Sequence, residues 1–555
     1  MRPAKNWILQ PKNDAAGRIS RETGLHHEIC SILLRRGLTD GAAIERFLSP
    51  SIDSLESPYA FGDMKKAVDR LRLAATRKEK VLVYGDYDVD GITGSAILYP
   101  ILRTAGIDAD VHIPHRVNEG YGLNRASLEK LIEKDYRVVV TVDNGITGMS
   151  QIEYLVSKGV DVIVVDHHTP KEGLPPAYCI VSSANADGKG DKNLAACGLA
   201  FKLGWALLGD FKAVEEYLDL VTLGTIADLA PVTGDNRILL KYGLPILSKT
   251  KRPGLRALMT VARVGRQATY RDIAFGLGPR INASGRMGSP EQAFRLLTTK
   301  DDKEAFELAR FLDEGNRDRQ KVELAAFEEA AARVIEEGAG SVIVLESEKW
   351  HEGVLGIVAS RLVERFHKPA IVISLKDGIG KGSGRSTPAF SIYESVLQCE
   401  SLLVTFGGHA QACGLTITRE NIAEFRQKLH ETAVKHASLG LASDLHIEAE
   451  LPPAHIDLQF LRELEKLAPF GPGNPKPLFL TCGMQVKGDV RKRGKDTLQC
   501  WMTGGDGKTT CEAVGFRMYE RWKATSKRNL DLVYQPALVE WNGIASIQLE
   551  IEDWR

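Results

Sequence analysis

The chain has 555 residues, 43% of them hydrophobic and 26% charged, which is ordinary globular composition and, at roughly 150 residues per domain, predicts three to four domains. No segment approaches the roughly 18 consecutive apolar residues that a membrane span requires, so the composition excludes a membrane protein and a disordered chain. The 72 Lys and Arg equal the 72 Asp and Glu, a balance that neither indicates nor excludes a nucleic-acid partner.

The N-terminal segment contains no motif that indicates a function. Its first residues, MRPAKNWILQPKNDAAGR, lack an apolar stretch followed by a small-residue cleavage site, so we expect no secretory signal and a cytoplasmic protein. We treat residues 1–60 as a flanking region.

A repeated strand, turn and helix pattern follows and predicts an α/β domain over residues 61–245. The strands are continuous apolar runs, as expected of parallel strands that are covered on both faces. A packing helix is expected over residues 92–106. The pattern therefore predicts a doubly wound parallel sheet, with strands at residues 81–85, 111–113, 138–142, 162–165 and 179–181.

A helical connector and a second α/β domain come next. Residues 246–337 form the connector, and the stretch from about 300 to 337 has no proline and dense mixed charge, which predicts one long exposed helix. At 1.5 Å per residue this helix would span roughly 50 Å as a strut between two domains. A strand, helix and strand pattern then restarts and predicts a second α/β domain over residues 338–450.

The C-terminal residues 451–555 show short alternating strands, and Asn542-Gly543 is a typical hairpin turn. This pattern predicts a small OB-like β-barrel. Between residues 476 and 529, 12 Lys and Arg outnumber 5 Asp and Glu, and four of these basic residues, Arg491, Lys492, Arg493 and Lys495, lie together. Either a surface for a phosphate backbone or a solvated basic loop explains this charge.

Potential metal ligands follow three of the predicted strands in the first domain. Because parallel strands present their carboxyl ends at one edge of the sheet, these side chains are expected to meet. A further acid, Asp228, follows an apolar helical stretch. The residues are Asp86, Asp88 and Asp90 after the first strand, Asp143 after the third, and Asp166, His167 and His168 after the fourth.

Such a cluster of carboxylates is costly unless cations neutralise it. Oxygen and imidazole ligands favour Mn²⁺ or Mg²⁺ over a structural zinc, and the 8 cysteines lie scattered without a C-x-x-C pair, as buried reduced thiols do. These candidate residues are more numerous than the ligands that one ion uses. Two ions about 3.5–4 Å apart are the arrangement that hydrolyses phosphate esters. Taken singly, an Asp-x-Asp turn or a His pair is more often structural; their coincidence at successive strand ends favours a metal centre.

The order of the motifs resembles a known superfamily. GDYDVDG, VDNG, VDHH and TIADLAP, at residues 85–91, 142–145, 165–168 and 225–231, resemble the four motifs of the DHH phosphoesterases. Further motifs are similar to those of the RecJ family, bacterial exonucleases that degrade single-stranded DNA from the 5′ end. These are PHRVNEGYGL (114–123), GPRINASGRMG (278–288), WHEGVLGIVASRL (350–362), GKGSGRS (380–386) and TFGGHAQACGL (405–415).

The resemblance implies a set of metal ligands and catalytic residues in the first, DHH domain. Asp88, Asp90, Asp143, His167 and Asp228 would bind two divalent ions, Mn²⁺ or Mg²⁺, with Asp143 as the bridge. Asp86 and His168 would contact metal, orient the nucleophilic water or hold the scissile phosphate, so the catalytic set is Asp86, Asp143 and His168.

The resemblance also implies substrate-binding residues in the DHH domain and in the second domain. In the family this second domain is called DHHA1 and holds the 5′-phosphate end of the substrate. The loop at residues 380–386 has the glycines of a phosphate nest. An arginine in a surface ion pair and a Gly-rich tight turn are the alternative readings. The expected substrate-binding residues are Arg116, Arg280, Ser383, Arg385 and His409.

The implied function is metal-dependent hydrolysis of single-stranded DNA from the 5′ end to 5′-mononucleotides, in DNA recombination and repair. A single-strand DNA-binding protein and a helicase are the implied protein partners. One alternative is a DHH-type phosphodiesterase that acts on short oligonucleotides, and another is a non-catalytic scaffold that binds single-stranded DNA. The long helix and basic barrel favour a polymeric substrate, and the filled ligand positions favour an enzyme.

Overall fold

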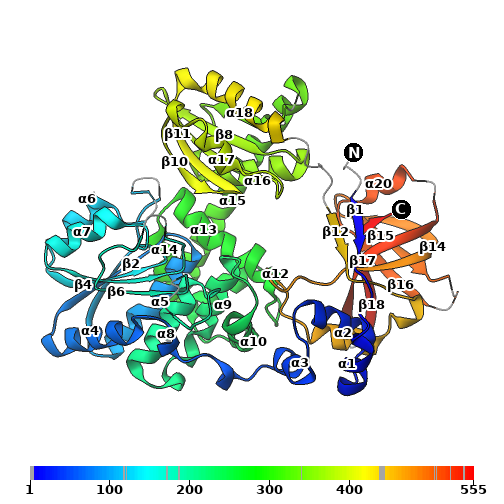
Figure 1. Cartoon of the computed structure of the whole chain (residues 1–555), viewed down its shortest axis with the longest axis horizontal. Helices are drawn as coiled ribbons and strands as arrows, with labels where there is room; N and C mark the ends of the chain where they lie inside the picture. The colour runs from blue at the N-terminus through cyan, green and yellow to red at the C-terminus, as the bar shows by residue number, and fades with distance from the viewer. Residues whose placement is uncertain are drawn as a thin grey trace.

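The structure, a computed structural model, consists of three bodies that are each built around a β-sheet (Figure 1). The first α/β domain, which we call the catalytic body because the expected catalytic residues lie in it, is on the left of the view, the second domain at the top and the barrel on the right. The described residues are 5–555 without 117–118, 121, 171–172, 185–187, 339, 437–443, 506, 508, 526 and 542–543.

The first sheet confirms the predicted doubly wound α/β fold. Its five strands are all parallel, in the order β3-β2-β4-β5-β6. The edge strand β3 begins earlier than the predicted 111–113, because its outward residues Asp108 and Asp110 are polar and the apolar pattern misses them. The strands are β2 (Lys80–Gly85), β3 (Asp108–His112), β4 (Tyr136–Val142), β5 (Asp161–Asp166) and β6 (Cys179–Ser182).

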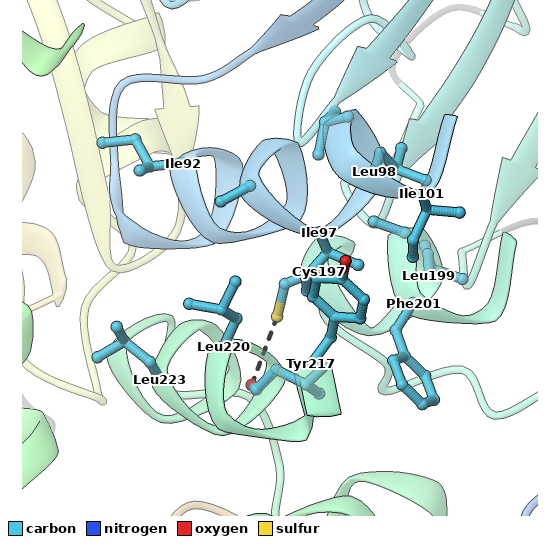
Figure 2. Close-up of a cluster of buried hydrophobic side chains, with 14 of the residues drawn as sticks. Ile92, Ile97, Leu98, Ile101, Cys197, Leu199, Phe201, Tyr217, Leu220 and Leu223 are labelled. Atoms are coloured by element: carbon cyan, nitrogen blue, oxygen red, sulfur yellow. Dashed lines mark hydrogen bonds between the residues drawn. The ribbon is translucent and has the colours of Figure 1, made fainter. Parts of the chain in front are cut away.

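Helices cover both faces of this sheet. Helix α5 is buried along most of its length, because it lies between the sheet and two further apolar helices, α8 and α9. Figure 2 shows part of the resulting core, where Ile97 of α5 lies beside Cys197 of α8, with Leu220 of α9 across from them. The helices are α4 (Met64–Arg77), α5 (Val89–Thr104), α8 (Ala196–Leu208) and α9 (Leu218–Ala227), with α6 (Arg125–Ile132) and α7 (Met149–Ser157) on the other face.

The predicted long helix is α15 (Asp302–Glu337), with 36 residues and a length of about 54 Å. The prediction that it is exposed is wrong for one of its faces. Its first half packs on three helices of the catalytic body and its second half on α16 of the second domain. A buried polar stretch, Asp313 to Glu323, lies between these halves. The packing helices are α11 (Pro253–Val261), α13 (Gly278–Met287), α14 (Pro290–Thr298) and α16 (Leu355–Phe366).

The second sheet has the order β10-β11-β9-β8-β7. Helix α16 covers one face, and α17 (Ile392–Leu397) and α18 (Ile422–His436) pack beside the strands. The strands are β7 (Ile343–Ser347), β8 (Ala370–Lys376), β9 (Ile379–Arg385), β10 (Leu403–His409) and β11 (Ala412–Thr418).

The prediction of a phosphate nest at residues 380–386 is wrong. Strand β9 occupies these residues and pairs with β8 and β11, so the ladder uses its backbone N–H groups. Its glycines allow close packing: a Cβ at Gly380 would lie 2.7 Å from Ile373, and one at Gly384 would lie 2.6 Å from the Cys413 sulfur. The glycines thus resemble those of a loop but serve a tightly covered strand.

The C-terminal body is a closed barrel, as predicted, because β14 pairs with β17 as well as with β15. Strands β17 and β18 pair as far as Trp541 and Ile544, and the predicted Asn-Gly turn between them lies outside the described residues. The strands are β13 (Ala449–Glu450), β14 (Phe479–Arg493), β15 (Thr497–Thr503), β16 (Thr510–Gly515), β17 (Asn529–Trp541) and β18 (Ile544–Trp554), with the short helix α20 (Tyr519–Lys523).

The N-terminal segment packs on this barrel. Strand β1 (Asn6–Leu9) pairs with β12 (Asp444–Ile447). Helices α1 (Ala16–Thr23), α2 (His27–Arg35) and α3 (Gly41–Leu48) share a core with α19 (Leu458–Glu465) and the barrel strands. The apolar faces of α1 and α2 therefore have a partner more than 400 residues away in the sequence.

Arginine 237 joins the barrel to the catalytic body. It lies on α10 (Gly234–Ser248) and is buried. Its guanidinium donates to the carbonyls of Phe47 and Leu467, both at 2.9 Å. This one side chain therefore contacts the N-terminal segment and the segment that leads into the barrel.

Two expectations about the whole chain can be compared with the structure. All 8 cysteines are free thiols, but Cys482 is exposed, so the expectation that all are buried is wrong for this residue. Within the described ranges, none of the helices combines the length and the apolar character needed to cross a membrane.

Candidate active site

The carboxyl ends of the parallel strands bring acids and histidines together in the catalytic body. Asp86 follows β2, Asp143 follows β4, and Asp228 ends helix α9. Their ligand atoms fall into overlapping groups in which all atoms lie within 4.8 Å of one another. The groups are Asp86, Asp88 and Asp143; Asp90, His167 and Asp228; and Asp143, His167 and His168. We refer to these residues as the acidic cluster.

His167 lies at the centre of the acidic cluster. Its Nε2 atom is 3.2 Å from Asp143 Oδ1, 3.8 Å from Asp90 Oδ2 and 3.9 Å from Asp228 Oδ2. One imidazole nitrogen therefore faces carboxylates from three separate chain segments. Every residue predicted to bind metal or to act in catalysis lies in the cluster.

Local backbone structure holds the first of these acids in place. Asp88 caps α5, and its Oδ1 accepts from the backbone N–H groups of Asp90 and Gly91 at 3.0 and 3.2 Å. A Cβ at Gly91 would lie 2.5 Å from the Asp86 backbone nitrogen, so only glycine allows the chain to turn back this closely. The turn that places both acids therefore depends on glycine.

Two other acids have distinctive backbone surroundings. The carboxylate of Asp90 accepts from the backbone N–H groups of Ala196 and Cys197 at the start of α8, both at 2.8 Å. Asp143 has φ +64°, a left-handed conformation that costs a non-glycine residue roughly 1–2 kcal/mol. Strain of this kind is concentrated at functional sites.

The electrostatics of the acidic cluster favour bound cations. Burial, together with neighbouring carboxylates, raises the pKa of Asp86 and of Asp143 well above the ordinary value. Burial, with Asp90 and Asp88, raises the pKa of Asp228 to about 8. In the described part of the chain, Asp86 Oδ1, Asp143 Oδ1 and His167 Nε2 are buried without a hydrogen-bond partner. Oxygen and imidazole ligands in this state fit divalent cations.

Asp166 differs from the other acids because it supports a neighbour. Its Oδ1 atom lies 2.7 Å from His168 Nδ1, and its Oδ2 accepts from the Ile146 N–H at 3.0 Å. This pairing overcomes the effect of burial and lowers the pKa of Asp166. Asp166 therefore orients His168, a role that the sequence did not reveal although the residue lies in the VDHH motif.

Three arginines adjoin the acidic cluster. Arg116, in the turn after β3, interacts electrostatically with Asp86 on one side and with Arg286 and Arg385 on the other. Burial and the neighbouring guanidinium groups lower the pKa of Arg286 to about 10. The Arg116 guanidinium lies 5.1 Å from the centroid of the Tyr87 ring, between the acids Asp86 and Asp88 in sequence. We refer to Arg116, Arg286 and Arg385 as the arginine cluster.

The arginine cluster spans the contact between the catalytic body and the second domain. Arg286, on α13, donates to the Gly353 carbonyl at 3.2 Å. Arg385, on β9, donates to Ser383 Oγ at 3.2 Å, and a Cβ at Gly356 would lie 2.9 Å from its guanidinium. A group bound here would contact both bodies.

Two predicted substrate-binding residues lie elsewhere. Arg280 Nε and Nη2 lie 2.9 and 2.8 Å from Asp313 Oδ1, and its Nη1 donates to the Gly276 carbonyl, so its guanidinium is occupied by the protein. His409 is exposed at the tip of β10. Strand pairing aligns it with Ala412 and Arg385, on the same side of the sheet and about 10 Å from Arg385.

Arg286 is the residue that the sequence analysis missed. It belongs to the GPRINASGRMG motif, as Arg280 does, and the two arginines are six positions apart on one helix. At 3.6 residues per turn they point in different directions from α13. The motif supplied the signal, but only the packing of α13 shows which arginine lies beside Arg116 and Tyr87.

Family models match the chain in three places. The DHH family N-terminal domain covers residues 80–225, the DHHA1 domain covers residues 339–435, and the RecJ OB domain covers residues 447–553. The acidic cluster lies within the first match except for Asp228, which lies three positions beyond its end. Ser383, Arg385 and His409 lie within the second.

Curated proteins and solved structures are similar over nearly the whole chain. The single-stranded-DNA-specific exonuclease RecJ of Bacillus subtilis is 34% identical over 99% of this chain and 70% of the relative. The protein of that name from Escherichia coli is 30% identical over 96% and 97%. RecJ of Thermus thermophilus in complex with Mn²⁺ superposes with a TM-score of 0.85 at 30% identity, over 100% of this chain and 80% of that one. Its complex with Mg²⁺ gives 0.80 at 27% identity, over 100% and 79%.

Proposed function

Because the chain belongs to the RecJ family of single-stranded-DNA-specific exonucleases, we propose that it hydrolyses single-stranded DNA from the 5′ end to 5′-mononucleotides, in DNA recombination and repair. The observation that best supports this function is the juxtaposition of the acidic cluster with the arginine cluster. The acidic cluster suits cations and the arginine cluster suits a phosphate. Together they fit a strand whose terminal phosphate lies one nucleotide from the phosphodiester at the metals.

The acidic cluster would hold two divalent ions, and both Mn²⁺ and Mg²⁺ suit its ligands. The proposed ligands are Asp88, Asp90, Asp143, His167 and Asp228. When bound, the ions activate water and neutralise the charge that develops on the scissile phosphate. Asp143 is the proposed bridge because it belongs to two of the groups.

Asp86 and His168 are the proposed positioning groups for water and phosphate. Each belongs to one of the groups that include Asp143, so in this proposal each would lie beside the bond that is cleaved. Asp166 holds the His168 ring at 2.7 Å and so limits its rotation. The chain therefore supplies a fixed arrangement of polar groups before the substrate arrives.

The arginine cluster gives the reaction its direction. A pair of metal ions has no preference for either end of a strand, but Arg116, Arg286 and Arg385 together would bind a terminal 5′-phosphate. Ser383 adds a hydroxyl beside Arg385. With the 5′-phosphate held here, the next phosphodiester would lie at the acidic cluster, and cleavage would release one nucleotide. In this proposal Arg286 takes the place expected for Arg280, and His409 lies at the rim.

Digestion of end-labelled oligonucleotides tests this function. With Mn²⁺ or Mg²⁺, we expect 5′-mononucleotides from the 5′ end of single-stranded DNA and no digestion of the matching blunt duplex. Activity restricted to di- and trinucleotides would instead support the short-oligonucleotide phosphodiesterase. Failure to cleave any substrate, with binding of single strands retained, would support the scaffold.

The basic hairpin of the barrel is proposed to bind the DNA backbone away from the metals. Arg491, Lys492, Arg493 and Lys495 are all exposed, although Lys492 also pairs with Glu520 at 3.2 Å. Reversal of all four to Glu is expected to weaken binding of single-stranded DNA. The slope of log affinity against log salt should fall by up to about 3, because each phosphate contact with a single strand contributes roughly 0.7.

Measurement of binding across a salt series checks this expectation. Reversal of the exposed Lys65 and Lys158 is the control, since α4, which holds Lys65, and α7, which ends just before Lys158, lie on the side of the catalytic body away from the barrel (Figure 1). An unchanged slope in the quadruple variant would show that this hairpin does not contact the DNA.

The proposed function also involves other proteins. A blunt duplex cannot be degraded by an enzyme that acts on single strands, so a helicase would have to supply the strand. A single-strand DNA-binding protein would keep that strand open. The proposed site of action is the cytoplasm.

A further inference from the structure

A large pocket lies in the catalytic body where helices α5, α9, α10, α11 and α14 meet, and we call it the back pocket. Its volume is about 1150 Å³. Small-molecule sites occupy roughly 300–1,000 Å³, so this pocket is large enough for a nucleotide. We propose that it binds a nucleotide, with the phosphate on its lysines and the base beside a tyrosine. The inference goes beyond the proposed function, because this site is not the acidic cluster.

The back pocket and the acidic cluster lie at opposite ends of the same helices. Asp88 and Asp90 lie at the start of α5, whereas Arg103, in its last turn, lines the pocket. Likewise, Asp228 ends α9, and Asp219, in its first turn, lines the pocket. Helix α5 has 16 residues and is about 24 Å long. A nucleotide in the back pocket would therefore not contact the metals.

The helices around the back pocket are tightly packed against one another. A Cβ at Gly243 of α10 would lie 1.8 Å from Thr222 Oγ1 of α9, and one at Gly254 of α11 would lie 1.7 Å from the Leu296 carbonyl oxygen of α14. Protein interiors packed to this density leave few voids larger than a water molecule. The pocket is therefore part of a close-packed helical frame and not the result of loose packing.

Two prolines within helices line the back pocket. Pro100 lies inside α5 and Pro245 lies inside α10. A proline inside a helix is unfavourable, because it removes a backbone hydrogen bond and clashes with the preceding turn. Natural sequences depart from such local rules mainly at functional sites. Two departures in separate helices at one pocket therefore favour a function for it.

The charge of the lining suits an anion, because five cations face two acids. One of the acids, Asp219, is buried and already has partners within the wall. It accepts from the Thr250 hydroxyl at 2.7 Å and lies 3.4 Å from Arg252 Nε. Lys249 and Lys251, on either side of Thr250, are exposed. The lining cations are Arg103, Lys249, Lys251, Arg252 and Lys300, and the acids are Glu216 and Asp219.

The fields of the neighbouring helices explain only part of this charge. Lys249 and Lys300 follow the C-terminal ends of α10 and α14, where cations are favoured. Lys251 and Arg252 directly precede α11, and the N-terminal end of a helix disfavours cations. A bound phosphate would compensate for this unfavourable placement.

Two tyrosines supply the aromatic part of the lining. The Arg103 guanidinium lies 5.9 Å from the Tyr99 ring centroid, and the Phe294 ring meets Tyr99 edge-on at 5.9 Å. The Arg252 guanidinium lies 5.4 Å from the Tyr217 ring centroid. Tyr217 is buried and Tyr99 is partly exposed, so Tyr99 is the ring that a ligand can contact. A ring among cations fits a nucleotide, which joins an aromatic base to phosphate.

Equilibrium dialysis with labelled dAMP tests the proposal, with EDTA present so that no metal occupies the acidic cluster. We expect saturable binding of one dAMP per wild-type chain. Combined Lys249→Glu and Lys251→Glu should lower the affinity at least about 10-fold, the effect of losing one hydrogen bond to a charged group. Combined Lys65→Glu and Lys158→Glu is the matched control and should bind as wild type does. Absence of saturable binding to the wild-type protein would overturn the proposal.

Competition identifies the chemistry that the back pocket recognises. Unlabelled ATP and dAMP should both displace the label, and their order distinguishes a free cellular nucleotide from a product of DNA digestion. Inorganic phosphate should require a concentration at least about 10-fold higher. Displacement by phosphate as readily as by dAMP would show an anion site without recognition of the base, which contradicts the proposal.

Two further variants separate the back pocket from the arginine cluster. Tyr99→Ala should lower the affinity for dAMP about 5–100-fold, the effect of losing one stacked base, and leave that for phosphate unchanged. Arg385→Ala should bind dAMP as wild type does. Loss of binding in Arg385→Ala, with binding retained in the double lysine variant, would place the nucleotide at the arginine cluster and overturn the proposal. Because dialysis needs no metal, its result stands even if the protein digests no DNA, which would contradict only the proposed function.

Discussion

Replacement of Asp143 by alanine is expected to abolish digestion of single-stranded DNA, with kcat lowered by at least about 10³-fold. Asp143 belongs to two of the ligand groups and its Oδ1 lies 3.2 Å from His167 Nε2. Loss of a ligand shared by both proposed ions would disturb both of them. Metal stabilisation of the transition state is worth several kcal/mol, and each roughly 1.4 kcal/mol of activation free energy changes the rate tenfold. Initial rates on a 5′-labelled oligonucleotide in Mn²⁺ measure this loss.

Thermal unfolding distinguishes a lost ligand from a damaged fold. The pKa of Asp143 is raised in the folded protein by burial and by Asp88, so at neutral pH its ionised form opposes folding in the absence of metal. The metal-free variant should therefore unfold at or above the wild-type temperature. Added Mn²⁺ should raise the wild-type Tm more than that of the variant.

The exposed Asp108→Ala, on β3, is the matched control and should retain both activity and the response to Mn²⁺. Full activity of Asp143→Ala would contradict its assignment as a ligand. A variant that unfolds well below wild type without metal would show that Asp143 supports the fold instead.

The acidic cluster could be predicted from the sequence because its position follows from topology alone. Apolar runs identify parallel strands, and parallel strands bring the residues after them to one edge. Asp86, Asp143 and His167 meet for this reason, without any knowledge of how helices pack. Asp228 could be listed as a further acid after an apolar helical stretch, but strand topology does not bring the end of a helix to this edge, so its assignment as a ligand came from the family resemblance.

The arginine cluster could be predicted only in part because it depends on packing between bodies. Arg116 follows a strand, but Arg286 faces the cluster only because α13 packs in one orientation against α15. The glycines of β9 resembled a phosphate loop because a close-packed strand and a tight turn both require residues without a Cβ.

The packing of the N-terminal segment could not be predicted either. The partner of α1 and α2 is distant in sequence, and no local pattern identifies it.

The opposite charges of the acidic cluster and the arginine cluster are complementary. Several buried carboxylates and several neighbouring guanidinium groups would each be unfavourable alone. The electrostatic interaction of Arg116 with Asp86 links the two clusters, while Arg286 and Arg385 donate to Gly353 and Ser383. A substrate that brings phosphates, together with cations, would satisfy both clusters, so the unbound protein retains charges that binding neutralises.

The second large effect is expected at Arg385, as a loss of preference for a 5′-phosphate. We expect the wild-type protein to degrade 5′-phosphorylated strands faster than 5′-hydroxyl strands. In Arg385→Ala this ratio should fall about 10- to 150-fold, because a hydrogen bond to a charged group contributes roughly 1.5–3 kcal/mol. Arg385→Lys should lie between the two, since it keeps the charge but loses the planar guanidinium fork.

Rates on the two substrates, measured side by side, give the ratio directly and cancel any general loss of activity. The exposed Arg419→Ala, which follows β11 in the same domain, is the control and should keep the wild-type ratio. An Arg385→Ala protein that loses activity equally on both substrates would place this residue outside phosphate recognition. A fall in the ratio of the rates on 5′-phosphorylated and 5′-hydroxyl strands would show that a side chain of the second domain selects the end of the strand that the metal centre cleaves.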